Sequence, residues 1–146
     1  MDLGLSGKKA LITGSTRGIG RAIANLLADE GADLAICSRN QEEVDSAVAE
    51  LSAKGVKVTG SVVDVADKES YQAWIASAGE EMGGIDIFIP NVSAGGGDMS
   101  EQGWLNNFNV DLLGTTRGVE AAMPFLEKSD AASIVVISST AGVETF

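Results

Sequence analysis

The chain has 146 residues, 45% of them hydrophobic, and a formal net charge of −11. This composition predicts one globular domain and excludes a disordered chain. The negative charge argues against nucleic acid and anionic membrane as partners, and no apolar run is long enough to span a bilayer. With no histidine and a single cysteine, histidine-dependent mechanisms and the common zinc sites are excluded, and no metal site is expected. The start of the chain has no signal-peptide pattern, so we expect a cytoplasmic protein.

The stretch from Thr13 to Gly20, Thr-Gly-Ser-Thr-Arg-Gly-Ile-Gly, is the centre of the sequence pattern. Residues 10–12 before it suit a strand buried on both faces, and the apolar residues from Ile19 to Leu27 recur at helical spacing. A glycine-rich turn at a helix N-terminus presents unpaired N–H groups, so it predicts a phosphate site. The spacing differs from Walker A and from Gly-x-Gly-x-x-Gly. Taken alone, the octet is equally compatible with a tight connection.

The rest of the chain alternates strand and helix patterns. Helices are expected after the N-caps Asn40 and Asp67, and a longer helix is expected from Ser100 to Leu126. Asn40 and Glu43 have the spacing of a capping box. This alternation predicts an α/β fold with a parallel sheet and helices on both faces. The four further strands are expected at 32–37, 56–63, 85–89 and 133–138.

One polar or glycine residue follows each of the five expected strands. Ligands of such sheets bind beyond the carboxyl ends of the strands, so these residues are candidates for one site. Each also has an ordinary interpretation, because aspartate and serine at a strand end commonly form turns. The residues, in strand order, are Gly14, Arg39, Asp64, Asn91 and Ser139.

Five motifs in one order resemble the short-chain dehydrogenase/reductase family. The octet 13–20 matches its Thr-Gly-x-x-x-Gly-Ile-Gly, and Asp64-Val65 matches its Asp-Val element. Pro90-Asn91-Val92-Ser93 aligns with Asn-Asn-Ala-Gly and keeps only the second asparagine. Residues 109–114 match Asn-Val-Asn-Leu-x-Gly with an aspartate at the second asparagine, and residues 137–142 match Ile-Ser-Ser-x-Ala-Gly. The resemblance covers nearly the whole chain.

This resemblance implies a Rossmann-like, doubly wound parallel sheet in the order 3-2-1-4-5 and a dinucleotide-binding domain over residues 1–146. It also implies hydride transfer between a nicotinamide and a small-molecule carbonyl or alcohol, in a full-length protein that is a dimer or tetramer. Ser139 would hydrogen-bond the substrate carbonyl, and Asn109 would hold a water molecule in a proton relay. The expected cofactor-binding residues are Gly14, Ser15, Thr16, Arg17, Gly18, Ile19, Gly20, Arg39, Asp64, Val65 and Asn91.

The family's acid–base segment, Tyr-x-x-x-Lys, has no match in the sequence. The single tyrosine is Tyr71, in another helix, and position 75 is Ile75 rather than lysine. We therefore expect an amino-terminal portion of a longer reductase, incomplete at its carboxyl end and inactive alone. The alternative is a catalytically incompetent nucleotide-binding or interaction module.

The end of the second expected strand favours NADP over NAD as the cofactor. NAD sites usually carry an acidic residue there, whereas this chain reads Cys37-Ser38-Arg39. An arginine can pair with the 2′-phosphate of NADP, and Arg17 in the glycine turn is a second candidate. The ordinary interpretation is that both arginines simply face solvent on an acidic protein.

Overall fold

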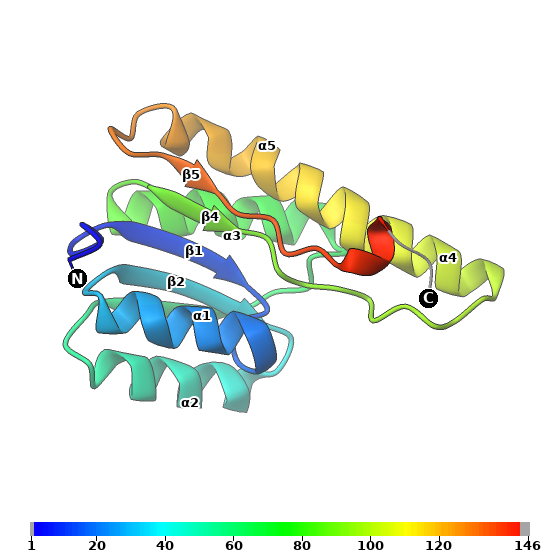
Figure 1. The fold of residues 1–146 in the computed structure, drawn as a ribbon, viewed down its shortest axis with the longest axis horizontal. Coiled ribbons are helices and arrows are strands. Elements are labelled where there is room, and N and C mark those ends of the chain that lie inside the picture. Colours follow the sequence, from blue (N-terminus) through cyan, green and yellow to red (C-terminus); the bar gives the residue numbers. More distant parts are fainter. Residues whose placement is uncertain (1, 144–146) are drawn as a thin grey trace.

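The computed structural model describes residues 2–143. Within them, five parallel strands form one sheet in the order β3-β2-β1-β4-β5 (Figure 1). β1 is the central strand, so the predicted order is confirmed. The strands are β1 (Lys9–Thr13), β2 (Asp33–Ser38), β3 (Val58–Val62), β4 (Ile87–Ile89) and β5 (Ser133–Ile134).

Helices cover both faces of the sheet, and each face has its own core. α1 (Gly18–Asp29) and α2 (Gln41–Ser52) lie on one face, and α3 (Lys68–Met82) and α5 (Gly114–Leu126) lie on the other (Figure 1). Side chains of a strand alternate between faces, so Ala10 and Ile12 join the core under α1 and α2 while Leu11 joins the opposite one. Among the described residues, none of the helices has the length and hydrophobicity to cross a bilayer.

The expected N-caps Asn40 and Asp67 are confirmed, and Ser100 caps a third helix. The side chain of Asn40 accepts a hydrogen bond from the Glu43 amide, that of Asp67 from Ser70, and that of Ser100 from Gly103. These caps stabilise helix starts because they satisfy amides that have no partner within the helix.

The long helix expected from Ser100 to Leu126 forms as three consecutive segments. α4 (Glu101–Asn107) passes into a π-helical turn, η1 (Phe108–Leu113), and then into α5. Gly118 does not break α5, because it packs against the buried pair Tyr71 and Phe88, where a Cβ would overlap the tyrosine hydroxyl. Burial against α3 and β4 therefore outweighs the weak helix propensity of glycine.

The fifth strand is shorter than expected. β5 contains two residues instead of 133–138, although Val135 and Ile137 still donate backbone hydrogen bonds to the carbonyls of Phe88 and Pro90. Pro90 has no N–H to return a bond, which ends the regular ladder. A 3₁₀ turn, η2 (Thr140–Gly142), follows.

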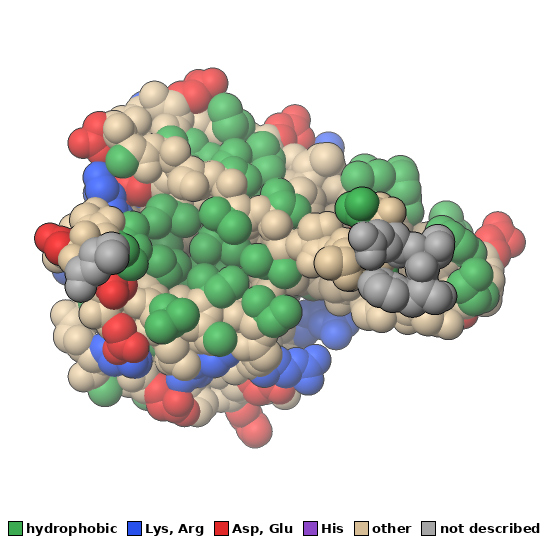
Figure 2. Space-filling model, in the orientation of Figure 1, with side chains coloured by type: hydrophobic (Ala, Val, Ile, Leu, Met, Phe, Trp, Pro, Cys, Tyr) green, Lys and Arg blue, Asp and Glu red, His purple; other side chains and the backbone are tan. Residues whose placement is uncertain are grey.

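The face that carries α1 and α2 has hydrophobic side chains at its surface beyond α1. Figure 2 shows them as a band over β4 and β5. Val135, whose side chain alternates to this face, is 46% exposed, whereas Ile134 is in register with Phe88 of the opposite core. Helix cover on this face is thus complete only over the first three strands.

Candidate cofactor and substrate site

The carboxyl ends of the strands meet at one edge of the sheet, and most of the candidate residues follow them directly. The turn 14–17 joins β1 to α1, Ser38 ends β2, and the segments after β3 and β4 leave from the same edge (Figure 1). The topology therefore gathers residues that are up to 125 positions apart, from Gly14 to Ser139, at one end of the molecule.

The glycines of the turn are required by its geometry. Gly14 and Gly18 have φ angles of +63° and +57°, in the left-handed region that favours glycine. A Cβ on Gly20 would overlap the carbonyl oxygen of Gly14 and lie 2.6 Å from Asn91 Nδ2. Around Gly18, in contrast, nothing would lie within 4 Å of an added Cβ. The turn is thus closed towards the sheet and open outwards.

The N-terminus of α1 differs from those of α2, α3 and α4. Arg17 occupies its N-cap position with no side-chain hydrogen bond, and its first turn has no acidic residue. The other three helices each have a capping side chain and an acidic residue in the first turn. The amides of α1 are therefore available to an external anion, and the helix dipole favours one.

Two hydroxyl residues of the turn are engaged within the fold. Ser15 is fully buried; its hydroxyl donates to the Ile12 carbonyl (2.9 Å) and accepts from the Cys37 amide (3.3 Å). Thr16 donates to Glu43 Oε2 (2.8 Å). The Ser15 backbone amide donates to the Cys37 carbonyl (3.2 Å), so Ser15 fixes the turn to β1 and β2.

The end of β2 carries the expected basic residue beside an unexpected acidic one. Arg17 and Arg39 are exposed, and Figure 2 shows basic side chains gathered at the lower right, beyond the ends of β1 and β2. Glu43 of α2 reaches the same place, because Ser38 Oγ also donates to its Oε2 (3.4 Å). Sequence reasoning assigned Glu43 to a cap and missed it as a site residue.

Asp64 and Val65 lie after β3 with different exposures. Asp64 is exposed and accepts a hydrogen bond from the Ala66 amide (3.0 Å), the turn contact that its ordinary interpretation predicts. Val65 is 4% exposed and packs in the core under α3 and α5. The Asp64 carboxylate therefore faces outwards, whereas Val65 can offer a ligand only its backbone.

Asn91 ties the end of β4 to the glycine turn. Its Nδ2 donates to the carbonyls of Thr13 (3.0 Å) and Gly14 (3.1 Å), and its amide donates to Thr13 Oγ1 (2.9 Å). Thr13, which is 1% exposed, is a second supporting residue that sequence reasoning missed. The side-chain amide of Asn91 therefore holds the backbone of the glycine turn in place.

Asn109 and Asp111 point to different neighbours from the π-helical turn. Asn109 Nδ2 donates to the Ala66 carbonyl (3.4 Å), and its Oδ1 accepts from Arg117 (2.8 Å), so it lies beside the end of β3. Asp111 Oδ1 accepts from the Ala94 amide (2.8 Å) in the segment after β4. The signal for Asp111 was its departure from the second asparagine of the family motif.

Ser139 lies at the start of η2 and is exposed. Its hydroxyl accepts a hydrogen bond from the Ala141 amide (3.2 Å) in its own turn. Among the described residues, no hydrogen bond joins Ser139 to Asn109.

Two titratable side chains in the core are held in their neutral forms. Burial raises the pKa of the Cys37 thiol to about 12, and burial also raises the pKa of Tyr71. A general acid–base phenol needs a pKa lowered towards neutrality, and Tyr71 has the opposite shift. Tyr71 is therefore a core residue. Within residues 2–143, no group of three or more aspartate, glutamate or cysteine side chains is arranged to hold a metal ion.

Comparison with known proteins identifies relatives along the whole chain. The family model of the short chain dehydrogenases matches residues 8–146. The chain is 38% identical over 147 residues to dehydrogenase/reductase SDR family member 4 of Mus musculus, covering 97% of this chain and 53% of the mouse protein. It is 37% identical over 149 residues to isoepoxydon dehydrogenase patN of Penicillium expansum, covering 100% and 58%. The chain spans about half the length of the curated relatives it matches.

Solved structures share the fold. An alcohol dehydrogenase from Thermococcus sibiricus complexed with 5-hydroxy-NADP has a TM-score of 0.91 and 29% identity, covering 97% of this chain and 62% of its own. Carveol dehydrogenase from Mycobacterium avium in complex with NAD has a TM-score of 0.90 and 26% identity, covering 97% and 57%. By its family match, its motifs and its strand order, the chain belongs to the short-chain dehydrogenase/reductase family.

Proposed function

We propose that this chain is the cofactor-binding part of an NADP(H)-dependent oxidoreductase that interconverts a small-molecule carbonyl and an alcohol. The observation that carries the proposal is the uncapped N-terminus of α1 above the glycine turn, at the carboxyl edge of the sheet. The solved relatives in complex with NAD and with 5-hydroxy-NADP support a nicotinamide cofactor. When bound, the nicotinamide donates hydride to the substrate carbon or accepts it.

The residues of the turn would bind the pyrophosphate. The free amides at the start of α1, around Gly18 and Ile19, face the open side of the turn and complement two negative charges. Because Gly14 and Gly20 have no side chains, the start of α1 packs closely against the end of β1 and against the Asn91 side chain. Asn91 would serve the ribose side by holding this backbone.

The adenosine end would lie between the ends of β2 and β3. Asp64 is exposed there, and the Val65 backbone follows it. Arg17 in the glycine turn and Arg39 after β2 are both exposed and can pair with a 2′-phosphate through charged hydrogen bonds. Two arginines with no acidic residue at the last positions of β2 favour NADP over NAD.

Two residues would act on the substrate side. The exposed Ser139 hydroxyl can rotate to donate a hydrogen bond to a carbonyl oxygen, which stabilises the negative charge that develops there. Asn109 would hold a water molecule in proton transfer. Its polar contacts to Ala66 and Arg117 fix the orientation of the side chain.

The full-length protein is proposed to be a homo-oligomer, a dimer or tetramer. Four large hydrophobic side chains are more than half exposed along α4 and η1, which supports burial against another surface. They are Trp104, Leu105, Phe108 and Leu112.

Arg39→Asp in the natural full-length protein tests the cofactor assignment. The substitution should weaken NADPH binding by about 2 kcal/mol, roughly 30-fold in Kd, because a charged hydrogen bond to the 2′-phosphate is lost and a repulsive charge is introduced. NADH binding should stay unchanged or improve. Lys57→Asp makes the same change in charge at the opposite end of the sheet, before β3, and should affect neither cofactor. Titration calorimetry measures both, and equal or tighter NADH binding by the unmutated protein would contradict the proposal.

A further inference from the structure

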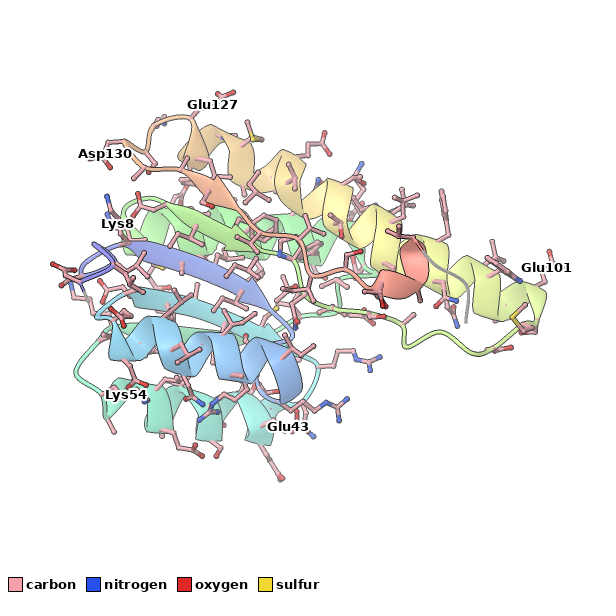
Figure 3. All side chains as sticks on the ribbon, in the orientation of Figure 1. Lys8, Glu43, Lys54, Glu101, Glu127 and Asp130 are labelled. Carbon is pink, nitrogen blue, oxygen red and sulfur yellow. The ribbon has the colours of Figure 1, made fainter. Side chains whose placement is uncertain are left out.

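Glu43 joins three elements at the adenosine end of the site. The sequence places it in a capping box with Asn40, and Asn40 Oδ1 does accept from the Glu43 amide (3.1 Å). The reciprocal hydrogen bond of a capping box, from the Asn40 amide to the Glu43 carboxylate, is not formed. The carboxylate points instead to the glycine turn and to β2. Its Oε2 accepts from Thr16 Oγ1 (2.8 Å) and Ser38 Oγ (3.4 Å). Figure 3 shows Glu43 at the end of α2 that faces the start of α1.

The two hydroxyls that bind Glu43 flank the two arginines proposed to hold the 2′-phosphate. Thr16 precedes Arg17, and Ser38 precedes Arg39. Each hydroxyl has one proton to donate, and each gives it to the carboxylate. Neither hydroxyl can donate to a phosphate while this arrangement persists.

The negative charge of Glu43 is not cancelled by Arg21, the basic residue that lines the same hollow. A surface hollow of about 530 Å³ between α1 and α2 is lined by Glu43, Thr16, Arg21 and Glu50, among others. The guanidinium of Arg21 is already paired with Glu50. Among the described residues, Glu43 belongs to none of the ion pairs, so a phosphate placed between Arg17 and Arg39 would face its unpaired carboxylate.

We propose that Glu43 is a specificity-determining residue that opposes the 2′-phosphate and so limits the preference for NADP over NAD. The inference rests on the proposed function, because it takes the adenosine ribose to lie between Arg17 and Arg39. Like charges repel, so the Glu43 carboxylate would repel the 2′-phosphate of NADP but not the 2′-hydroxyl of NAD. The carboxylate can even accept a hydrogen bond from the hydroxyl.

Glu43→Gln in the natural full-length protein tests the role directly. The variant keeps an acceptor for Thr16 and removes the charge. Binding of 2′,5′-ADP and of 5′-AMP, measured by calorimetry, reports on the adenosine end without turnover. We expect 2′,5′-ADP to bind five- to twentyfold more tightly and 5′-AMP to change less than twofold. NADPH and NADH should follow the same pattern.

Asp45→Asn is the matched control. It removes one negative charge from the same helix, at an exposed position where, within residues 2–143, the Asp45 carboxylate accepts a side-chain hydrogen bond only from Gln41 (2.8 Å). We expect it to leave both ligands within twofold. Glu43→Ser is a second neutral variant, which should shift the same ratio in the same direction if Glu43→Gln folds poorly.

Three results would overturn the role of Glu43: no change in 2′,5′-ADP binding, an equal change for both ligands, or an equal effect of Asp45→Asn. Failure of the proposed function is distinguishable from these. It would appear as 5′-AMP binding as tightly as 2′,5′-ADP in the unmutated protein together with no effect of Arg39→Asp. A selective gain for 2′,5′-ADP in Glu43→Gln would uphold the opposing charge even then.

Discussion

The glycine turn and the segment around Ser139 lie at the same edge of the sheet but are held very differently. At the turn, Ser15 bridges two strands, Asn91 binds two successive carbonyls, and Gly20 packs against the Gly14 carbonyl. At Ser139, the side chain is exposed and bonds only within its own turn among the described contacts. The glycine turn, on the proposed cofactor side, is therefore held by packing and buried hydrogen bonds, whereas Ser139, on the proposed substrate side, is an exposed polar group at a strand end.

Ser139→Ala should separate the two regions most clearly. In the natural full-length protein we expect kcat for carbonyl reduction to fall about 10²-fold, as for loss of one donor to a developing oxyanion. The free energy of unfolding should change by less than about 1 kcal/mol, since only the cap of a short 3₁₀ turn is lost. Steady-state kinetics and urea unfolding measure the two effects. Ser138→Ala is the neighbouring control, and equal losses in both variants would contradict the role.

Gly20→Ala should show the opposite behaviour on the cofactor side. The added methyl overlaps the Gly14 carbonyl and displaces the Asn91 amide, so we expect a loss of about 1–3 kcal/mol in stability. Cofactor binding should weaken at least about tenfold, because the amides of the turn move with the backbone. Thermal unfolding and calorimetry test this.

The control for that variant is Gly142→Ala, where an added Cβ has nothing within 4 Å and φ lies outside the left-handed region. It should leave both stability and cofactor affinity nearly unchanged. Normal binding by Gly20→Ala would show that the turn is less closely packed than the contacts indicate.

The smallest expected effect is a loss of stability at alkaline pH, and it comes from two titratable side chains in the core beneath both regions. Burial raises the pKa of Cys37 from 9.0 to about 12 and raises that of Tyr71 above its ordinary 10.0. A raised pKa in the folded state contributes stability that is fully present below the unfolded value and is lost as pH rises. The loss should therefore begin near pH 9.

Urea unfolding between about pH 8 and about pH 11 tests the alkaline loss. Tyr71→Phe should make the decline in stability shallower, because one group that ionises only after unfolding is removed. Phe88→Leu, a change in the same core without a titrating group, should lower stability equally across that range. If stability declined with pH as steeply in Tyr71→Phe as in the unmutated protein, the interpretation of Tyr71 as a buried, neutral phenol would be contradicted.

Much of the fold followed from local signals. The caps at Asn40 and Asp67 and the glycine turn were predicted from the residues, the strand order was predicted from the family resemblance, and the structure confirms them. The prediction of the fifth strand at 133–138 was wrong in length, because a missing N–H on the neighbouring strand at Pro90 ends the ladder. That information lies more than 40 residues away in the sequence.

The sequence by itself determined which residues end strands and begin helices, because periodicity, caps and glycine turns act over a few positions. Only the tertiary structure decided where the side chains at those ends go. Glu43 bonds across 27 positions to Thr16, and Asp111 across 17 to Ala94. Spacing along one element cannot report a partner on another element, since that partner is selected by how sheet and helices pack. The charge balance at the proposed adenosine end therefore depends on a contact that no motif in the sequence records.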